Sequence, residues 1–320
     1  MKLRDMEFGN VFCAPGARGF GGEGYPFHKA ARLLGMTWKG TTFVAKTMTM
    51  RACIGNLPLK GDGMTPKEKR PRSVVVKPFS GHVLNAAGLS NPGAAWLFSR
   101  AGWNNLTEPF VLSFMAAEET PEARMNELNQ FVTVFEHYLY ALSDFQAPVA
   151  LQLNFGCPNM SFRADALLDE IREMLELASG LSIPLIANFS PVTPEQVVAQ
   201  TASHPACDAL WIANTVPWGY PEIDWQRIFG TEASPLREQG FEQSGGLSGP
   251  ACLPLTAALV KKAREYGISK PIVAGNGIQR AEDVLLLKDV GADAIALGIV
   301  GMVRPWRMRG IIRTANEVLA

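Results

Sequence analysis

The sequence lacks the features that mark several large classes of protein. Neither charge sign is in excess, because 30 Lys and Arg residues balance 30 Asp and Glu residues at a formal net charge of zero. A balanced charge gives no sign of a nucleic-acid or membrane surface. No apolar run approaches the ~18 residues of a membrane span, and the first residues, Met1 to Glu7, hold no apolar signal core. We therefore expect a cytoplasmic protein that binds neither nucleic acid nor membrane.

The cysteines lack any pairing pattern. The chain has 5 of them, an odd number, scattered and without a CxxC pair: Cys13, Cys53, Cys157, Cys207 and Cys252. This distribution argues against a disulfide framework and against a zinc site, and it fits a reducing compartment. We expect no bound metal.

Apolar runs of β type are present, and they alternate with helical patterns. Hydrophobic residues make up 47% of the chain and charged residues 19%, which allows a large core. Eight short, continuous runs read as parallel strands buried on both faces: Val11–Ala14, Thr42–Lys46, Phe110–Met115, Val149–Asn154, Leu185–Phe189, Ala209–Ala213, Ile272–Ala274 and Ala294–Leu297. This count favours an α/β fold of the (β/α)8 TIM barrel type, with residues 1–320 as a single domain.

The helical patterns and two long interruptions complete the organisation. The clearest helices are expected at Glu122–Leu142, Ala164–Ala178, Pro194–Ser203, Ala251–Tyr266, Ala281–Val290 and Gly301–Leu319. Arg51–Gly81 reads as a long excursion or hairpin, and Pro217–Gly246 as a second long loop. Both follow the carboxyl end of a strand, where a barrel carries its active site, so both are lid candidates. A surface loop or an oligomer contact is an equally good interpretation.

One segment carries the strongest chemical signal. Leu153-Asn154-Phe155-Gly156-Cys157-Pro158-Asn159 follows a buried strand, so its polar groups are expected at the mouth of the barrel. Two asparagines flank one cysteine, and their amides offer the donors and acceptors that an amide- or imide-bearing substrate needs. From the residues alone, Cys157 is a base, a nucleophile or a packing residue.

Glycines follow the last two predicted strands. Gly275 and Gly277 come after the seventh strand, and Gly298 comes after the eighth. Such glycines let backbone N–H groups approach a phosphate closely. A single pair of this kind is more often a tight turn, but two such turns on adjacent strands favour a phosphate site.

Several further segments, in the same order along the chain, resemble the dihydroorotate dehydrogenase family. The cysteine before Pro158-Asn159 resembles its signature. The other matching segments are Phe43-Val44-Ala45-Lys46-Thr47, Asn85-Ala86-Ala87-Gly88-Leu89-Ser90-Asn91, Asn214-Thr215, Gly245-Gly246-Leu247-Ser248-Gly249-Pro250, Gly275-Asn276-Gly277-Ile278 and Gly298-Ile299. Ala14-Pro15-Gly16 is similar to the family's Ala-Ser-Gly turn, with Pro15 in place of the serine. The resemblance extends from about Val11 to Pro305.

The resemblance implies an FMN-dependent oxidoreductase that oxidises dihydroorotate to orotate in pyrimidine biosynthesis. Cys157 would remove the C5 proton, while the C6 hydride passes to flavin N5. Substrate contacts are implied for Lys46, Asn85, Ala87, Gly88, Leu89, Asn154, Asn159, Asn214 and Thr215. Cofactor contacts are implied for Ala14, Gly16, Lys46, Thr47, Asn188, Gly246, Gly249, Gly275, Gly277, Gly298 and Ile299.

Two departures from the family pattern leave alternatives open. Asn188 stands where the family has a lysine against flavin N1 and O2, so a lower flavin reduction potential or a substitute cation is expected. Met160-Ser161-Phe162-Arg163 replaces the usual loop after Asn159. The alternative function is a flavin oxidoreductase acting on another cyclic amide or pyrimidine. A barrel without turnover is a third hypothesis, against which the intact Cys157 and Lys46 argue.

The resemblance also implies partners. A homodimer is expected, with an electron-transfer flavoprotein subunit as a possible addition. Within the family the electron acceptor is fumarate, NAD reached through a partner, or quinone. The lack of a hydrophobic N-terminal extension favours the acceptors that are not membrane-linked.

Overall fold

The eight predicted strands form one parallel sheet that closes on itself. The computed structural model describes residues 1–142, 145–155 and 164–319. The strand order is β3-β14-β13-β10-β9-β8-β7-β4. A parallel bridge between Phe12 and Thr42, with a 3.0 Å hydrogen bond from Cys13 N to Thr42 O, joins the first strand to the last. The fold is therefore a (β/α)8 TIM barrel, as predicted.

The strands lie close to their predicted bounds. They are β3 (Val11–Cys13), β4 (Phe43–Val44), β7 (Phe110–Phe114), β8 (Val149–Asn154), β9 (Leu185–Phe189), β10 (Ala209–Ile212), β13 (Ile272–Gly275) and β14 (Ala294–Leu297). Every residue of β7 and β9 is buried, because helices cover the outer face and side chains fill the interior.

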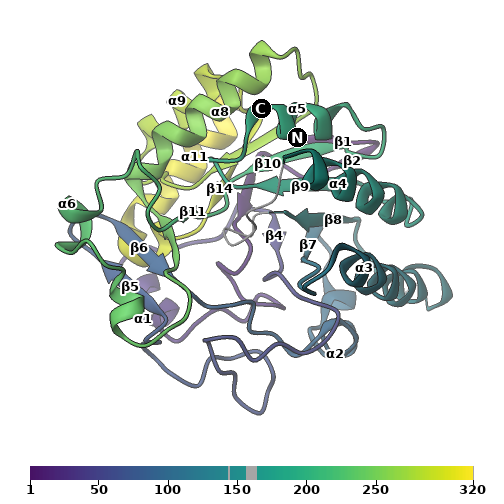
Figure 1. Ribbon diagram of the computed structural model, residues 1–320, viewed down its shortest axis with the longest axis horizontal. Helices are drawn as coiled ribbons and strands as arrows, with labels where there is room; N and C mark the ends of the chain where they lie inside the picture. Colours follow the sequence, from purple (N-terminus) through teal and green to yellow (C-terminus); the bar gives the residue numbers. More distant parts are fainter. Residues whose placement is uncertain (143–144, 156–163, 320) are drawn as a thin grey trace.

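Helices pack around this barrel, and Figure 1 shows α3, α4 and α5 on one side and α8, α9 and α11 on the other. Their bounds are α1 (Phe27–Leu33), α2 (Ala94–Arg100), α3 (Pro121–Glu136), α4 (Ala164–Ser179), α5 (Glu195–Ser203), α8 (Leu253–Glu265), α9 (Ala281–Asp289), α10 (Val300–Val303) and α11 (Met308–Val318). A π-helical turn, His137–Ala141, extends α3.

The prediction of one helix over Gly301–Leu319 was wrong. The segment divides into α10, a 3-10 turn at Pro305–Arg307, and α11. Pro305 lacks the N–H that a continuous helix requires, and it pushes the preceding residue out of the helical region. Arg304 accordingly has φ −145° and ψ 52°.

The two excursions meet in a small antiparallel sheet that the sequence did not predict. Its strand order is β11-β12-β6-β5, with β5 (Val74–Lys77), β6 (His82–Asn85), β11 (Val216–Pro217) and β12 (Gly246–Ser248). Figure 1 shows β5 and β6 at one side of the barrel, toward α6 (Trp225–Phe229). The second excursion also contains α7 (Pro235–Glu238), so its prediction as a plain loop was wrong. Leu84, Leu236 and Leu247 are among the buried residues that give this sheet its own apolar core.

A short hairpin, β1 (Lys2–Leu3) and β2 (Met6–Glu7), precedes the barrel. Arg4 forms an ion pair with Asp208, which immediately precedes β10. The hairpin therefore covers the amino-terminal end of the strands. Within the described ranges, no helix has both the length and the apolar character needed to cross a membrane.

Candidate active site

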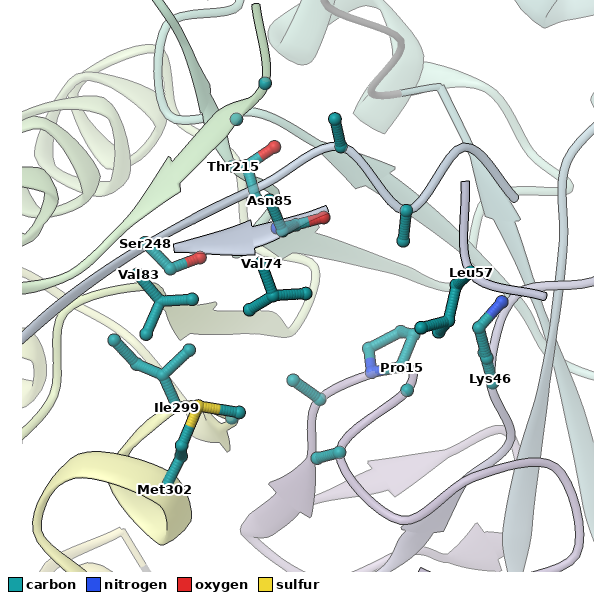
Figure 2. Close-up of a pocket in the computed structure, with 18 of the residues that line it drawn as sticks. Pro15, Lys46, Leu57, Val74, Val83, Asn85, Thr215, Ser248, Ile299 and Met302 are labelled. Carbon is teal, nitrogen blue, oxygen red and sulfur yellow. The ribbon is translucent and has the colours of Figure 1, made fainter. Parts of the chain in front are cut away.

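A large cavity opens at the carboxyl ends of the barrel strands, with a volume of about 1540 Å³. It gathers most of the predicted site residues from segments far apart in the sequence. Those that line it are Ala14, Gly16, Lys46, Thr47, Asn85, Ala87, Gly88, Leu89, Asn154, Asn214, Thr215, Gly246, Gly277, Gly298 and Ile299. Figure 2 shows Lys46, Pro15 and Leu57 on one side of the open space and Val83, Ser248 and Ile299 on the other.

The remaining predicted residues fall into two groups. Asn188, Gly249 and Gly275 lie behind the cavity wall and do not line it. Asn188 is fully buried. Cys157 and Asn159 lie outside the described residues.

Lys46, two residues after the end of β4, is held by the segments that follow β3 and β6. Its Nζ donates to the Ser90 carbonyl at 2.7 Å and lies 4.9 Å from the centre of the Phe20 ring. Removal of the ammonium from bulk water lowers the pKa of Lys46 from 10.5 to about 8, against a small opposing effect of Cys53. Among the described residues Lys46 has no carboxylate partner, so a ligand carboxylate would be its natural counter-ion.

Six polar side chains close a ring of hydrogen bonds at the bottom of the cavity. We call it the floor ring, and its members are Thr47, Ser113, Gln152, Asn188, Asn214 and Asn154. They come from β4, β7, β8, β9 and β10 or the residues directly after these strands. The ring joins the two asparagines that line the cavity to two buried amides that do not.

Links of the floor ring are of ordinary hydrogen-bond length on most sides. Thr47 Oγ1 and Ser113 Oγ are 2.9 Å apart, and Ser113 Oγ is 2.9 Å from Gln152 Oε1. Asn188 Nδ2 lies 3.3 Å from Gln152 Oε1 and 3.2 Å from Asn214 Oδ1. Asn214 Nδ2 donates to Asn154 Oδ1 at 2.7 Å, and Asn154 Nδ2 lies 3.5 Å from Thr47 Oγ1.

The segment Asn85–Leu89 forms another wall, and the first excursion fixes it. Asn56 donates from its backbone N–H to Ala87 O at 2.9 Å and from Nδ2 to Ala86 O at 2.9 Å. The same Nδ2 lies 2.7 Å from Gln243 Oε1 in the second excursion. Both excursions therefore support one cavity-lining segment, Asn85–Leu89.

Glycines form a cradle where strands β13 and β14 end. A Cβ on Gly277, whose φ is +117°, would lie 2.8 Å from Gly249 O and 2.9 Å from Leu253 N. The backbone N–H groups of Gly277, Ile278, Gly298 and Ile299 donate to no acceptor among the described residues. Four unengaged donors in so tight a cradle suit the oxygens of a phosphate group.

Sequence reasoning missed several residues that organise this site. Asn276 donates to Asn214 O at 2.8 Å and accepts from Gly249 N at 3.2 Å, so it links the last loops of the barrel. Gln152 and Ser113 were also missed. Their signal is a single polar residue inside an apolar strand, which indicates a side chain directed into the barrel but not its partners. No group of three or more metal-ligating side chains was found in the described part of the chain.

The fold and this site define the chain as a (β/α)8 barrel with one large ligand cavity at the carboxyl ends of its strands. Comparison with known proteins supplies the family. The family model described as dihydroorotate dehydrogenase matches residues 25–319. The chain belongs to that family.

Two relatives in this family are more than a quarter identical to the chain over the aligned residues. The dihydroorotate dehydrogenase B (NAD(+)) catalytic subunit of Bacillus pumilus (strain SAFR-032) is 27% identical over 273 residues, which cover 83% of this chain and 80% of the relative. The same subunit of Halalkalibacterium halodurans is 29% identical over 261 residues, covering 79% and 77%.

Solved structures agree on the fold. The ligand-free type of this dehydrogenase from Eimeria tenella superposes with a TM-score of 0.65 at 16% identity, over 99% of this chain and 85% of the other. The complex of the Eimeria tenella enzyme with ferulenol gives a TM-score of 0.66 at 14% identity, over 99% and 82%.

Proposed function

We propose that this chain oxidises dihydroorotate to orotate with FMN as its bound cofactor. The observation that carries the proposal is one cavity in which Lys46, Asn85, Asn154 and Asn214 face a common space beside the glycine cradle. A carboxylate and an imide edge are the groups that a lysine and three asparagines recognise. The cavity volume, about 1540 Å³, also exceeds the several hundred Å³ that one small ligand fills.

The residues present fit FMN at the cradle and at the floor. The N–H groups of Gly277, Ile278, Gly298 and Ile299 would hold its phosphate. Ala14 and Gly16, from the loop after β3, and Thr47 would lie against its ring system. When bound, FMN supplies the hydride acceptor that no protein side chain provides.

The chain's own residues would orient the substrate and move one proton. Lys46 would pair with the substrate carboxylate, and the asparagines would hold the amide edges. Cys157 would take the proton from C5, and it follows Asn154, the last residue of β8, by three positions in the sequence. Since a free thiol is mostly protonated at neutral pH, we expect turnover to rise as the solution becomes alkaline.

Anaerobic titration with dihydroorotate tests the proposal. The purified protein should be yellow, and dihydroorotate should bleach it. Cys157→Ala should keep the flavin and lose the bleaching. Protein that stays colourless after reconstitution with FMN would refute the proposal, while bleaching only by a different cyclic amide would favour the alternative substrate class.

The relatives' names support a proposal about the electron acceptor. Both relatives are called NAD(+)-linked catalytic subunits, so we propose that this chain is the cytoplasmic, homodimeric catalytic subunit of a larger enzyme. The isolated chain should then transfer electrons from dihydroorotate to an artificial dye but not to NAD. Direct reduction of NAD by the isolated chain would contradict this assignment, and rapid turnover with fumarate would identify the other acceptor.

A further inference from the structure

The floor ring has a direction. Asn188 Nδ2 donates at both of its links, to Gln152 Oε1 and to Asn214 Oδ1. Gln152 Oε1 accepts at both of its links, from Ser113 and from Asn188. Donation therefore starts at Asn188 and ends at Gln152 along both arms of the ring.

Two further atoms of the ring decide whether its direction could be reversed. Asn188 Oδ1 and Gln152 Nε2 are buried, and neither has a hydrogen-bond partner among the described residues. The oxygen and nitrogen ends of an amide have nearly the same shape. Turning over all four amides would keep every link of the ring while exchanging donor and acceptor. The shape of the barrel thus accommodates two opposite polarities.

The polarity determines what Asn154 and Asn214 can offer to a ligand. Both line the cavity, whereas Asn188 and Gln152 do not. In the observed polarity Asn214 uses Oδ1 toward Asn188 and Nδ2 toward Asn154. Reversal would exchange these two atoms in space. An imide edge alternates carbonyl and N–H groups, so it matches one polarity and opposes the other.

We propose that Gln152 and Asn188 are positioning residues that fix the donor and acceptor pattern of Asn154 and Asn214 for an imide-bearing substrate. The inference rests on the function proposed above and deepens it. Gln152 and Asn188 are both fully buried and do not line the cavity, so we expect the ring to carry their effect to the ligand.

Two isosteric variants separate the effect of the ring's hydrogen-bond direction on ligand binding from the effect of an added charge. Gln152→Glu keeps the acceptor Oε1, replaces the Nε2 donor with a second acceptor oxygen, and so supports only the observed direction. Asn188→Asp places two acceptor oxygens at position 188, which forces the reverse direction with Gln152 as the donor. Each variant adds one buried carboxylate without changing side-chain shape, so each is the matched control of the other.

The measurement is the dissociation constant of orotate on the FMN-loaded proteins, by calorimetry and by perturbation of the flavin spectrum. We expect Asn188→Asp to bind orotate at least about tenfold more weakly than Gln152→Glu, the equivalent of one mismatched hydrogen bond. Their thermal midpoints and FMN contents should be similar. Equal orotate affinity in the two variants would overturn the positioning role.

A neutral variant keeps the proposal testable if the added carboxylate expels the flavin. Gln152→Met removes the acceptor at which both arms of the ring end, so orotate should bind about tenfold more weakly while FMN is retained. Unchanged orotate affinity in Gln152→Met would overturn the proposal. Wild-type protein that holds FMN but binds no orotate would instead refute the function proposed above, and the positioning role with it.

Discussion

Lys46 is placed where its charge is unfavourable until a ligand arrives. Its pKa is lowered from 10.5 to about 8 by removal from water. The folded chain therefore holds fewer protons than the unfolded chain between these two pH values, so stability rises with pH through this window. Below pH 8 the full cost applies, and it is about 3 kcal/mol from the size of the pKa shift. A bound carboxylate would offset this cost.

Replacing Lys46 should therefore stabilise the ligand-free protein. Lys46→Met should raise the free energy of unfolding by about 2 kcal/mol at pH 7, and the gain should disappear above pH 10.5. Denaturant titrations at both pH values measure the effect. Lys69→Met, at an exposed lysine near the cavity mouth, is the control and should show no such gain. A loss of stability in Lys46→Met at pH 7 would contradict the expectation.

Gly277 should tolerate no side chain. Alanine there would combine backbone strain at φ +117° with contacts of 2.8 Å and 2.9 Å to backbone atoms. Gly277→Ala should cost roughly 3 kcal/mol and lose FMN, as measured by thermal unfolding and flavin content. Gly267, at φ +78°, offers the control, because no atom lies within 4 Å of the position that a Cβ would take there. Gly267→Ala should cost roughly 1 kcal/mol and keep the flavin. Equal effects of the two substitutions would show that strain, rather than the cradle, matters.

At the scale of elements, one buried ion pair joins α3 to α4. Arg124 Nη2 donates to Glu170 Oε2 at 2.7 Å, and Arg124 also donates to the carbonyls of Glu118 and Glu119 in the loop after β7. Removing Glu170 would leave a buried guanidinium without its carboxylate. The pair thus makes the position of α4 dependent on α3.

Two neighbouring carboxylates of α4, Asp169 and Glu170, should differ sharply in their contribution to the free energy of unfolding. Glu170→Ala should lower the free energy of unfolding by about 3 kcal/mol, because its partner is buried. Asp169→Ala removes a carboxylate that is 71% exposed and pairs with Arg172, so a change below about 0.5 kcal/mol is expected. Chemical denaturation measures both. Comparable losses would mean that burial does not distinguish the pairs.

Asn56 connects the two excursions over the cavity-lining segment Asn85–Leu89. Asn56→Ala removes the links to Ala86 and Gln243, whereas Gln243→Ala removes only the second. Orotate affinity should fall several-fold in Asn56→Ala and little in Gln243→Ala. A double-mutant cycle on stability should give a coupling of about 1 kcal/mol between the two side chains. Additive effects would argue against the contact.

At the scale of the whole molecule, stability and binding reside at opposite ends of the barrel. Phe8 is 2% exposed and lies between the N-terminal hairpin and β3, away from the cavity. Phe8→Ala should cost about 3–5 kcal/mol through the cavity it leaves. FMN and orotate affinities should remain at wild-type values under conditions where the variant is folded. A selective loss of orotate binding would contradict this separation.

The barrel could be predicted from the sequence because its strands are short, apolar and separated by helical patterns. β8, β9 and β14 have their predicted bounds. The small sheet could not be predicted. β6 pairs with β12, more than 150 residues later, and strands of two to four residues carry little periodicity. Such pairing depends on tertiary contacts rather than on local pattern.

The candidate site was predictable where motifs mark it and not where the fold alone creates it. Lys46, Asn85, Asn154 and Asn214 carried recognisable segments and do line one cavity. Gln152 belongs to no recognisable motif, since a single glutamine in an apolar strand gives no indication of its partners. Asn188 was expected at the cofactor. It does not line the cavity but belongs to the floor ring, and its contact with a cofactor stays a prediction.

The pairing of Asn85 with Gly246 has a consequence for folding during synthesis on the ribosome. The cavity-lining segment Asn85–Leu89 is synthesised early, but its partner strand emerges only after most of the chain, and the glycine cradle follows later still. A nascent or truncated chain can build several barrel strands without completing the place where ligands bind. Completion of the cavity is therefore a late event, and it distinguishes finished chains from unfinished ones.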